Sequence, residues 1–322
     1  MLKLFRTDVY LQAVIIAVVA ALLWVRAIVA PPSALPEGGG SLFYLLFGWM
    51  SPRTSVIAAL LLSVVEGILL NAMLFRNKMI NQGTLLPMLF FLLATGIGVD
   101  FLGLTPLLAG TFVIILCVGQ LMITGTLLSL PIDKTFGAAA CLSLATLFCP
   151  TAAVFLLPLM MSMLNYSLYS WRDWTMLLLG FAAPYIPLEL YWFLSGDSFY
   201  QNYLLLYSLT DIALVSSHSA ADWAMSASFL FFTLVAVTVT AFACQSHGTN
   251  YTKNATAILF FLVGSLLYAA YSTLNPVATQ AYAIPFAFSA SALFYDKKNK
   301  EWPWNIALVL ILLAAIAYNL VR

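Results

Sequence analysis

Glu66 has the setting that points most directly to chemistry. It lies in the middle of an apolar run, residues 54–75, that is long enough to cross a membrane. A carboxylate at that depth costs roughly 2.5–3.5 kcal/mol on insertion scales. We therefore expect Glu66 to be buried between helices and to be protonated or paired. It either binds a proton or a substrate, or is a neutral side chain that hydrogen-bonds a nearby backbone or hydroxyl group.

Arg26 and Glu189 form a second candidate pair. Arg26 lies about four residues from the predicted outer end of the run 9–30, and Glu189 lies about five residues from the predicted outer end of the run 174–194. At 1.5 Å of rise per residue, both are about 6–8 Å below the boundary of the membrane. An ion pair within the membrane is one way to hold both charges. The alternative is that Arg26 reaches toward headgroups and Glu189 meets water.

Several acidic residues fall in the loops predicted to lie outside the membrane. One of these carboxylates could act as a general base. The alternative is that they are ordinary solvated carboxylates of loops. The residues are Glu37, Asp197, Asp211 and Asp222. Arg26 and Arg53 lie near the same side, where a basic side chain can meet the phosphate of a lipid. With Glu66 and Glu189, these two arginines are the candidates for binding substrate or lipid.

The segment Trp171-Arg172-Asp173-Trp174 is the most distinctive tetrapeptide in the chain. Two tryptophans flank a pair of opposite charges just before an apolar run. Because tryptophan favours the membrane interface, we interpret this segment as a structural anchor.

The cysteines and histidines give no sign of a metal site. The four cysteines lie in apolar runs without CxxC spacing, and the two histidines form no ligand motif with them. We therefore expect buried thiols and neither a metal ion nor a cofactor.

The composition requires a membrane. Hydrophobic residues make up 63% of the 322 residues, and charged residues only 8%, against about 25% in an ordinary soluble domain. So few charges cannot cover a soluble protein of this size, and a net charge of +1 gives no footprint for nucleic acid. We expect one integral membrane domain over residues 1–322, with membrane lipid as its surroundings.

The apolar runs predict an all-α, polytopic transmembrane helix bundle with about eleven spans, and between nine and eleven if short pairs do not cross. A span needs about 20 apolar residues. The predicted spans are residues 9–30, 54–75, 84–98, 107–122, 136–149, 151–165, 174–194, 224–244, 255–273, 281–295 and 306–321. The pair 136–149 and 151–165 is separated only by Pro150, so it is either two short crossings or one re-entrant hairpin.

Charge placement predicts the orientation. With the N-terminus in the cytoplasm and Arg322 outside, ten of the 13 basic residues fall on the cytoplasmic side, as the positive-inside rule requires. These are Lys3, Arg6, Arg76, Lys78, Lys134, Arg172, Lys253, Lys297, Lys298 and Lys300. Two stretches in the outer loops, residues 41–50 and 203–215, are too short or too polar to span and predict interfacial helices on the outer face.

Residues 136–196 resemble a family of multi-pass inner-membrane proteins of Bacteroidota that is known only as a domain of unknown function. The shared order comprises Phe136-Gly137, Leu147-Phe148, Pro150, the tetrapeptide Trp171–Trp174, Gly180, Pro184-Tyr185 and Tyr191-Trp192-Phe193. The family is more basic ahead of the Phe-Gly step, where this chain has only Lys134. The resemblance implies the inner membrane of a Gram-negative bacterium and no particular activity.

A looser architectural resemblance is to GT-C-type glycosyltransferases that use polyprenyl-phosphate sugars. They too have many spans and an outer loop with interfacial helices, but their paired acidic motif is missing here. Our leading hypothesis is a protein that handles a lipid-linked or amphipathic substrate at the periplasmic face. The alternatives are a non-catalytic subunit of an envelope complex and a proton-coupled transporter that uses Glu66. The sequence does not decide whether the protein is an enzyme.

Overall fold

The computed structural model describes residues 8–31, 39–80, 83–97, 102–122, 132–195, 220–244, 248–271, 278–295 and 301–321. Within these ranges the secondary structure is helical, so the prediction of an all-α fold is confirmed there. The elements are α2 (Val9–Val29), α3 (Ser41–Phe47), α4 (Pro52–Arg76), α5 (Leu86–Thr95), α6 (Pro106–Leu121), α7 (Ile132–Phe148), the 3-10 helix η2 (Pro150–Phe155), α8 (Leu156–Asn165), α9 (Trp171–Ala182), α10 (Tyr185–Ser195), α13 (Ala220–Cys244), α14 (Thr249–Tyr271), α15 (Ala278–Ala281), α16 (Ala283–Tyr295) and α17 (Glu301–Val321).

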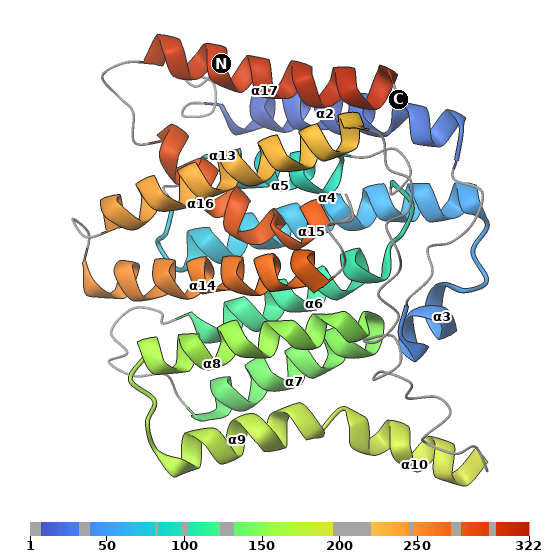
Figure 1. Ribbon diagram of the computed structural model, residues 1–322, viewed down its shortest axis with the longest axis vertical. Helices are drawn as coiled ribbons and strands as arrows, with labels where there is room; N and C mark the ends of the chain where they lie inside the picture. Colours follow the sequence, from blue (N-terminus) through green and yellow to red (C-terminus); the bar gives the residue numbers. More distant parts are fainter. Residues whose placement is uncertain are drawn as a thin grey trace.

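The long helices lie side by side and run back and forth across the molecule (Figure 1). From α2 to α17, each long helix, or pair of helices in line, runs opposite to the one before it in the chain. Their ends therefore collect on two opposite faces. We call the face where α4 ends the Arg76 face, on the left in Figure 1, and the face where α4 begins the Arg53 face, on the right.

Side-chain contacts give the register between neighbouring helices. The N–H of Leu104 donates to Ser55 Oγ at 2.9 Å, and Asn77 Nδ2 donates to Met122 Sδ at 3.0 Å. Helices α4 and α6 are therefore parallel, with the short helix α5 between them in the chain. Helices α8 and α14 are antiparallel, since Asn165 Nδ2 donates to the carbonyl of Lys253 at one end and Phe155 stacks on Phe261 further along.

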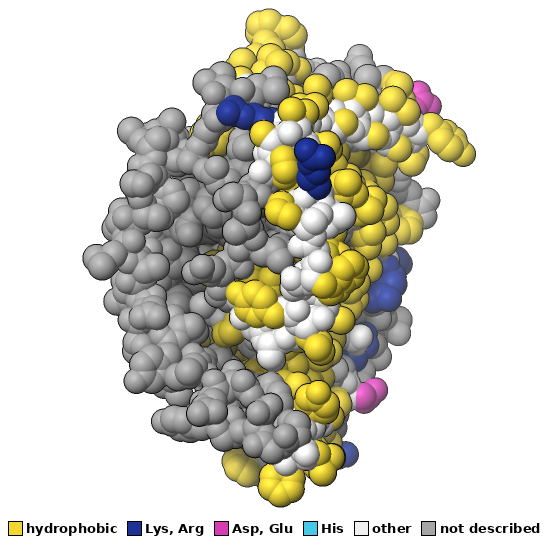
Figure 2. Space-filling model, turned by 90° about the vertical axis from the view of Figure 1, so that its right-hand side faces the viewer, with side chains coloured by type: hydrophobic (Ala, Val, Ile, Leu, Met, Phe, Trp, Pro, Cys, Tyr) yellow, Lys and Arg dark blue, Asp and Glu magenta, His cyan; other side chains and the backbone are white. Residues whose placement is uncertain are grey.

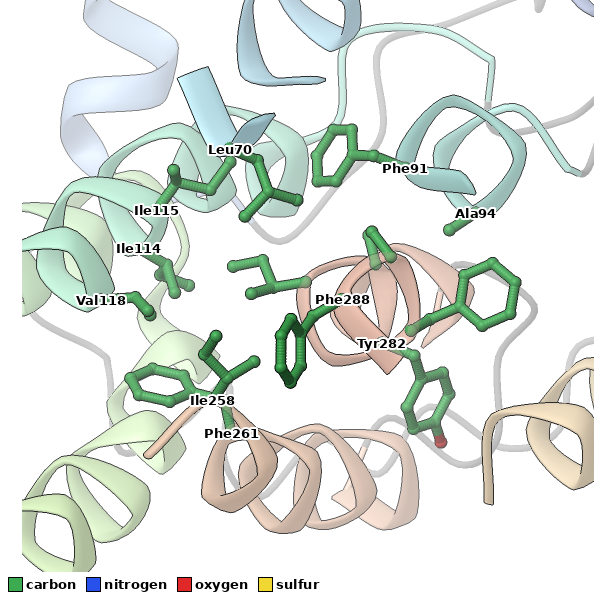
Figure 3. Close-up of a cluster of buried hydrophobic side chains, with 14 of the residues drawn as sticks. Leu70, Phe91, Ala94, Ile114, Ile115, Val118, Ile258, Phe261, Tyr282 and Phe288 are labelled. Carbon is green, nitrogen blue, oxygen red and sulfur yellow. The ribbon is translucent and has the colours of Figure 1, made fainter. Parts of the chain in front are cut away.

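The core lies where α4, α5, α6, α14 and α16 meet. Leu70, Phe91, Ile115, Phe261 and Phe288 point into one apolar cluster from these five helices (Figure 3). Every residue of α5 is buried, and α16 is buried on almost all sides. Helices that are apolar all round belong in the centre of a bundle, which explains why neither has a polar face.

Three helices are long and apolar enough to cross a membrane: Val9–Val29, Pro52–Arg76 and Thr249–Ala269. Shorter apolar helices accompany them, among them Pro106–Leu121 and Ala283–Phe294. Large apolar side chains point outward along α2 and α4, including Val14, Val18, Leu61 and Ile68. Hydrophobic side chains also make up much of the described surface on the Arg53 face (Figure 2). The outward apolar side chains along α2 and α4 suit lipid better than water.

Two of the predicted spans are broken in the structure. The predicted span 174–194 consists of α9 and α10, which meet at Ala183 and Pro184. Proline has no N–H to donate and its ring clashes with the preceding turn, so Pro184 ends α9 there. The predicted span 281–295 is interrupted at Tyr282, between α15 and α16. The helix within the predicted span 84–98 is α5, of only 10 residues.

The short helix α3 lies at the Arg53 face, as predicted for residues 41–50 (Figure 1). Its Phe43 is fully buried, and the N–H of Gly40 donates to the carbonyl of Phe148 at 2.8 Å. Leu45 and Trp49 are 74% and 78% exposed on the other side. The helix is thus attached to the bundle by buried Phe43 and by the Gly40 backbone, and it presents Leu45 outward, the pattern of an interfacial helix.

Candidate functional site

Glu66 lies on the face of α4 that packs into the bundle. Residues spaced three or four apart along this face are all buried: Ser55, Ala59, Ser63, Glu66, Leu70, Met73. The face lies against α6, which runs parallel to it, and the Glu66 carboxyl is beside the backbone of Phe112. Glu66 itself is 0% exposed, so the predicted burial between helices is confirmed.

Among the residues that the structure describes, neither carboxylate oxygen of Glu66 has a hydrogen-bond partner. The backbone N–H of Phe112, beside the carboxyl, is in the interior of α6, where helix geometry uses it within the helix. The hydroxyl of Ser63, one turn before, donates to the carbonyl of Ala59 at 2.8 Å. The structure therefore shows no hydrogen bond from the Glu66 carboxyl to a described side chain or backbone group, and a neutral Glu66 stays a prediction. A buried polar group without a partner costs about 1–3 kcal/mol.

The arginines of α4 are too far along the helix to pair with Glu66. Arg53 precedes it by 13 residues and Arg76 follows it by ten, which corresponds to about 20 Å and 15 Å of helical rise. Both side chains are exposed at the two ends of α4. Glu66 is therefore a buried acid with neither a hydrogen bond nor a cation from its own helix.

The predicted pairing of Arg26 with Glu189 is wrong. Arg26 is in the last turn of α2 and Glu189 is in α10, and these helices lie at opposite ends of the bundle (Figure 1). Both side chains are partly exposed. Depth along a helix, which motivated the pairing, says nothing about lateral position, and here several helices separate the two residues.

Most of the predicted outer acids cannot be placed. Glu37, Asp197 and Asp211 lie outside the described residues. Asp222 lies in α13, but its side chain is not among those described. Their proposed role as a general base therefore stays a prediction.

The tetrapeptide Trp171–Trp174 forms the first turn of α9. Ser170 is the N-cap, its Oγ accepts from the N–H of Asp173, and the Asp173 carboxylate accepts from the Ser170 hydroxyl at 2.7 Å and from its N–H. This capping box satisfies the free N–H groups of the first turn. Asp173 is therefore buried for a local reason, and Trp171 is exposed beside it.

A set of polar side chains that was not predicted from the sequence joins helices. Asn319 Nδ2 donates to the carbonyls of Leu23 and Gly96, and Thr105 Oγ1 lies 2.6 Å from Gln280 Oε1. Where η2 begins, beside the last turn of α14, Cys149 Sγ lies 3.0 Å from Thr151 Oγ1 and 4.0 Å from Tyr268 Oη. An isolated amide or hydroxyl in an apolar run was the available signal, since such groups need partners inside the bundle.

The fold and the Glu66 site define an all-α protein with candidate transmembrane helices and one acid buried without partners between two of its helices. No family model, curated protein or solved structure matches this chain. Within the described ranges, no group of three His, Cys, Asp or Glu side chains is close enough to hold a metal ion.

Proposed function

We propose that this chain is a multi-pass protein of the inner membrane of a Gram-negative bacterium, with eleven crossings, a cytoplasmic N-terminus and a periplasmic C-terminus. The alternating course of successive helices supports a multi-pass arrangement (Figure 1). The arrangement of basic residues supports the orientation, in which the Arg76 face is cytoplasmic. The resemblance of residues 136–196 to the Bacteroidota family agrees with this location and stays a hypothesis.

Helix α7 and the segment η2–α8 bear on the choice between two crossings and a re-entrant hairpin. Gly110 of α6 packs against the backbone of Ala145, and Gln120 packs against Gly137. Helix α7 thus lies along α6 over nearly its whole length, and its 17 residues correspond to about 26 Å of rise. These contacts favour two crossings.

Alkaline phosphatase fusions test the orientation, because this enzyme is active only outside the cytoplasm. A fusion within residues 196–219 should be active, and a fusion just after Arg76 should be silent. The opposite pattern, or activity at both places, would contradict the proposed topology.

We propose further that the protein is a proton-coupled transporter in which Glu66 carries the proton. The observation that supports it is the complete burial of both Glu66 oxygens at the α4–α6 contact without any hydrogen bond. An ionised carboxylate in such a place would cost many kcal/mol. In this packing we therefore infer that the carboxyl is neutral. An acid inside a membrane bundle is by default a hypothesis about a pathway or a relay.

The same contact would couple proton release to movement. When the proton leaves, the charge that forms has no partner between α4 and α6. The free energy then falls if the two helices separate enough to admit water, a cation or a substrate. Two packings of α4 against α6, one for each state of Glu66, are the kind of two-state element on which transport depends.

Complementation of a deletion strain tests this role. Glu66→Gln keeps the shape and removes the proton that can be exchanged, so this variant should accumulate to normal abundance and fail to restore function. Asp133→Asn is the matched control, since it removes an exposed acid in the first turn of α7. If Glu66→Gln restores function fully at normal abundance, Glu66 carries no proton.

A second candidate function keeps the outer-leaflet hypothesis, in which the protein handles a lipid-linked substrate such as a polyprenyl-phosphate sugar. The observation that favours it is the exposed Leu45 of α3 together with the exposed Trp49 that follows this helix, since both suit the membrane interface at the Arg53 face. Single replacements of Glu37, Asp197, Asp211 and Asp222 by their amides distinguish the classes. An enzyme should lose function with one of them, whereas an envelope scaffold should tolerate each.

A further inference from the structure

Two cavities flank the last turns of α4. The first, of about 220 Å³, lies between α4 and α6. Its lining includes Arg76 and Gln120 near the ends of the two helices and the apolar residues Leu69, Ile115 and Leu116 further in. Because α4 and α6 are parallel, Arg76 and Gln120 come together at the same face. We call this cavity the Arg76 groove.

The Arg76 groove is open along the side of the bundle. Arg76, Gln120, Leu116 and Ala72 on its lining are exposed. Gly119 is also on the lining and adds no side chain, and a Cβ placed there would lie 3.3 Å from Met73 Sδ. The groove therefore combines a basic and an amide side chain at one end with apolar walls along its length.

The second cavity, of about 350 Å³, lies on the other side of α4. Its walls are mostly apolar and include Val9 of α2, Ile68 and Phe75 of α4, and Leu85. Ala72 lines both cavities. The two spaces are therefore separated at that point only by the backbone of α4 and one methyl group.

We propose that these two cavities form a binding site for one anionic diacyl phospholipid. The phosphate is held by the Arg76 guanidinium and the Gln120 amide, and the two acyl chains lie on either side of Ala72. Charge complementarity selects the occupant, because a guanidinium donates two parallel hydrogen bonds to a phosphate and the apolar walls exclude a water-soluble anion. The site rests on the proposed membrane topology, which puts Arg76 at the level of the anionic cytoplasmic headgroups. It does not depend on the role of Glu66.

Lipid retention by purified protein tests the headgroup contact. Protein in detergent micelles is titrated with dioleoylphosphatidylglycerol or dioleoylphosphatidylcholine, and bound lipid is counted by native mass spectrometry. The wild type should hold phosphatidylglycerol more tightly than phosphatidylcholine. Arg76→Gln should weaken the phosphatidylglycerol complex about tenfold, since it removes a charged hydrogen bond. Arg172→Gln, an exposed arginine in the first turn of α9, should leave it unchanged.

A second variant tests the acyl-chain grooves. Ala72→Phe places a ring where both cavities meet, so retention of both lipids should fall. Leu61→Phe enlarges another exposed residue of α4 and should retain both. Melting temperatures of the four variants should match that of the wild type. A match shows that the loss of bound lipid is not caused by unfolding.

Three results would overturn the proposal. One is equal retention of phosphatidylglycerol by Arg76→Gln and the wild type, and another is full retention by Ala72→Phe. The third is displacement of the lipid by millimolar inorganic phosphate, which would assign the arginine to a soluble anion. Retention in detergent involves neither orientation nor transport, so these results are independent of the phosphatase fusions and of complementation by Glu66→Gln.

Discussion

Gln12 of α2 and Leu85 at the start of α5 are joined by a hydrogen bond between residues 73 positions apart. The N–H of Leu85 donates to Gln12 Oε1 at 2.8 Å, and Gln12 Nε2 donates to the carbonyl of Gly83 at 2.7 Å. One amide thus satisfies a donor and an acceptor where the chain enters α5. The first N–H groups of a helix have no partner inside it, so this side chain takes the place of a cap.

Gln12→Leu should lower the stability of the protein by about 2 kcal/mol, because it leaves two backbone groups unpaired at a largely buried position. Thermal unfolding in detergent measures the change. Ala13→Leu, on the exposed side of the next position, should be close to neutral. An unchanged melting temperature for Gln12→Leu would mean that water replaces the amide at no cost.

Tyr166→Phe should lower the free energy of unfolding by about 1–2 kcal/mol. Tyr166 Oη donates to Asn254 Oδ1 at 2.9 Å, and both residues are buried between the end of α8 and the start of α14. Removing the hydroxyl leaves the amide oxygen buried without its donor. Tyr169→Phe serves as the control in the same unfolding assay, since Tyr169 is exposed. A loss of stability of similar size in both variants would contradict a stabilising role for the buried hydrogen bond.

Ser167→Gly should raise stability by about 1 kcal/mol. Ser167 follows α8 with φ of 62° and its neighbour Leu168 donates back to the carbonyl of Met163, the bond that closes a Schellman motif. A side chain in this left-handed conformation is strained, and glycine is not. Ser167→Ala keeps the Cβ and should show no such gain. A fall in melting temperature for the glycine variant would indicate that flexibility of the unfolded chain dominates.

Gly40→Ala should detach α3 from the bundle. A Cβ at this position would lie 2.1 Å from the carbonyl oxygen of Leu147, too close for any adjustment of side chains alone. The bond from the Gly40 N–H to Phe148 would then be lost and Phe43 would become accessible. Protease cleavage within α3 reports the change, and Ser41→Ala, at an exposed position, should leave the protection intact.

Glu66→Leu should keep or raise thermal stability, by up to about 3 kcal/mol. The carboxyl makes no hydrogen bond, so an apolar side chain of similar size removes an unsatisfied group without breaking an interaction. The melting temperature of Glu66→Leu relative to that of Leu70→Ala, which creates a cavity in the same face, checks the prediction. A strongly destabilised Glu66→Leu would show that the acid has a partner.

The limits of several apolar helices were predictable from the sequence for a physical reason. Inside a membrane the backbone must satisfy its own hydrogen bonds, so an apolar run of sufficient length becomes a helix whatever lies beside it. This is why α2, α4 and α6 begin and end within a few residues of the predicted limits. The breaks at Pro184 and Tyr282 were harder to predict, because proline is tolerated in membrane helices when neighbours satisfy the freed groups.

The partner of each polar side chain was decided by tertiary structure alone. Hydropathy gives depth along a helix but not which helices are neighbours, so it matched Arg26 with Glu189 although α2 and α10 lie at opposite ends of the bundle. The sequence by itself determined that Glu66 must lie inside an apolar bundle. Only the packing of α4 along α6 decided that Glu66 has no hydrogen-bond partner among the described residues. In an apolar medium, the shapes of helix faces decide which helices pack together, and these faces come from segments that are far apart in the chain.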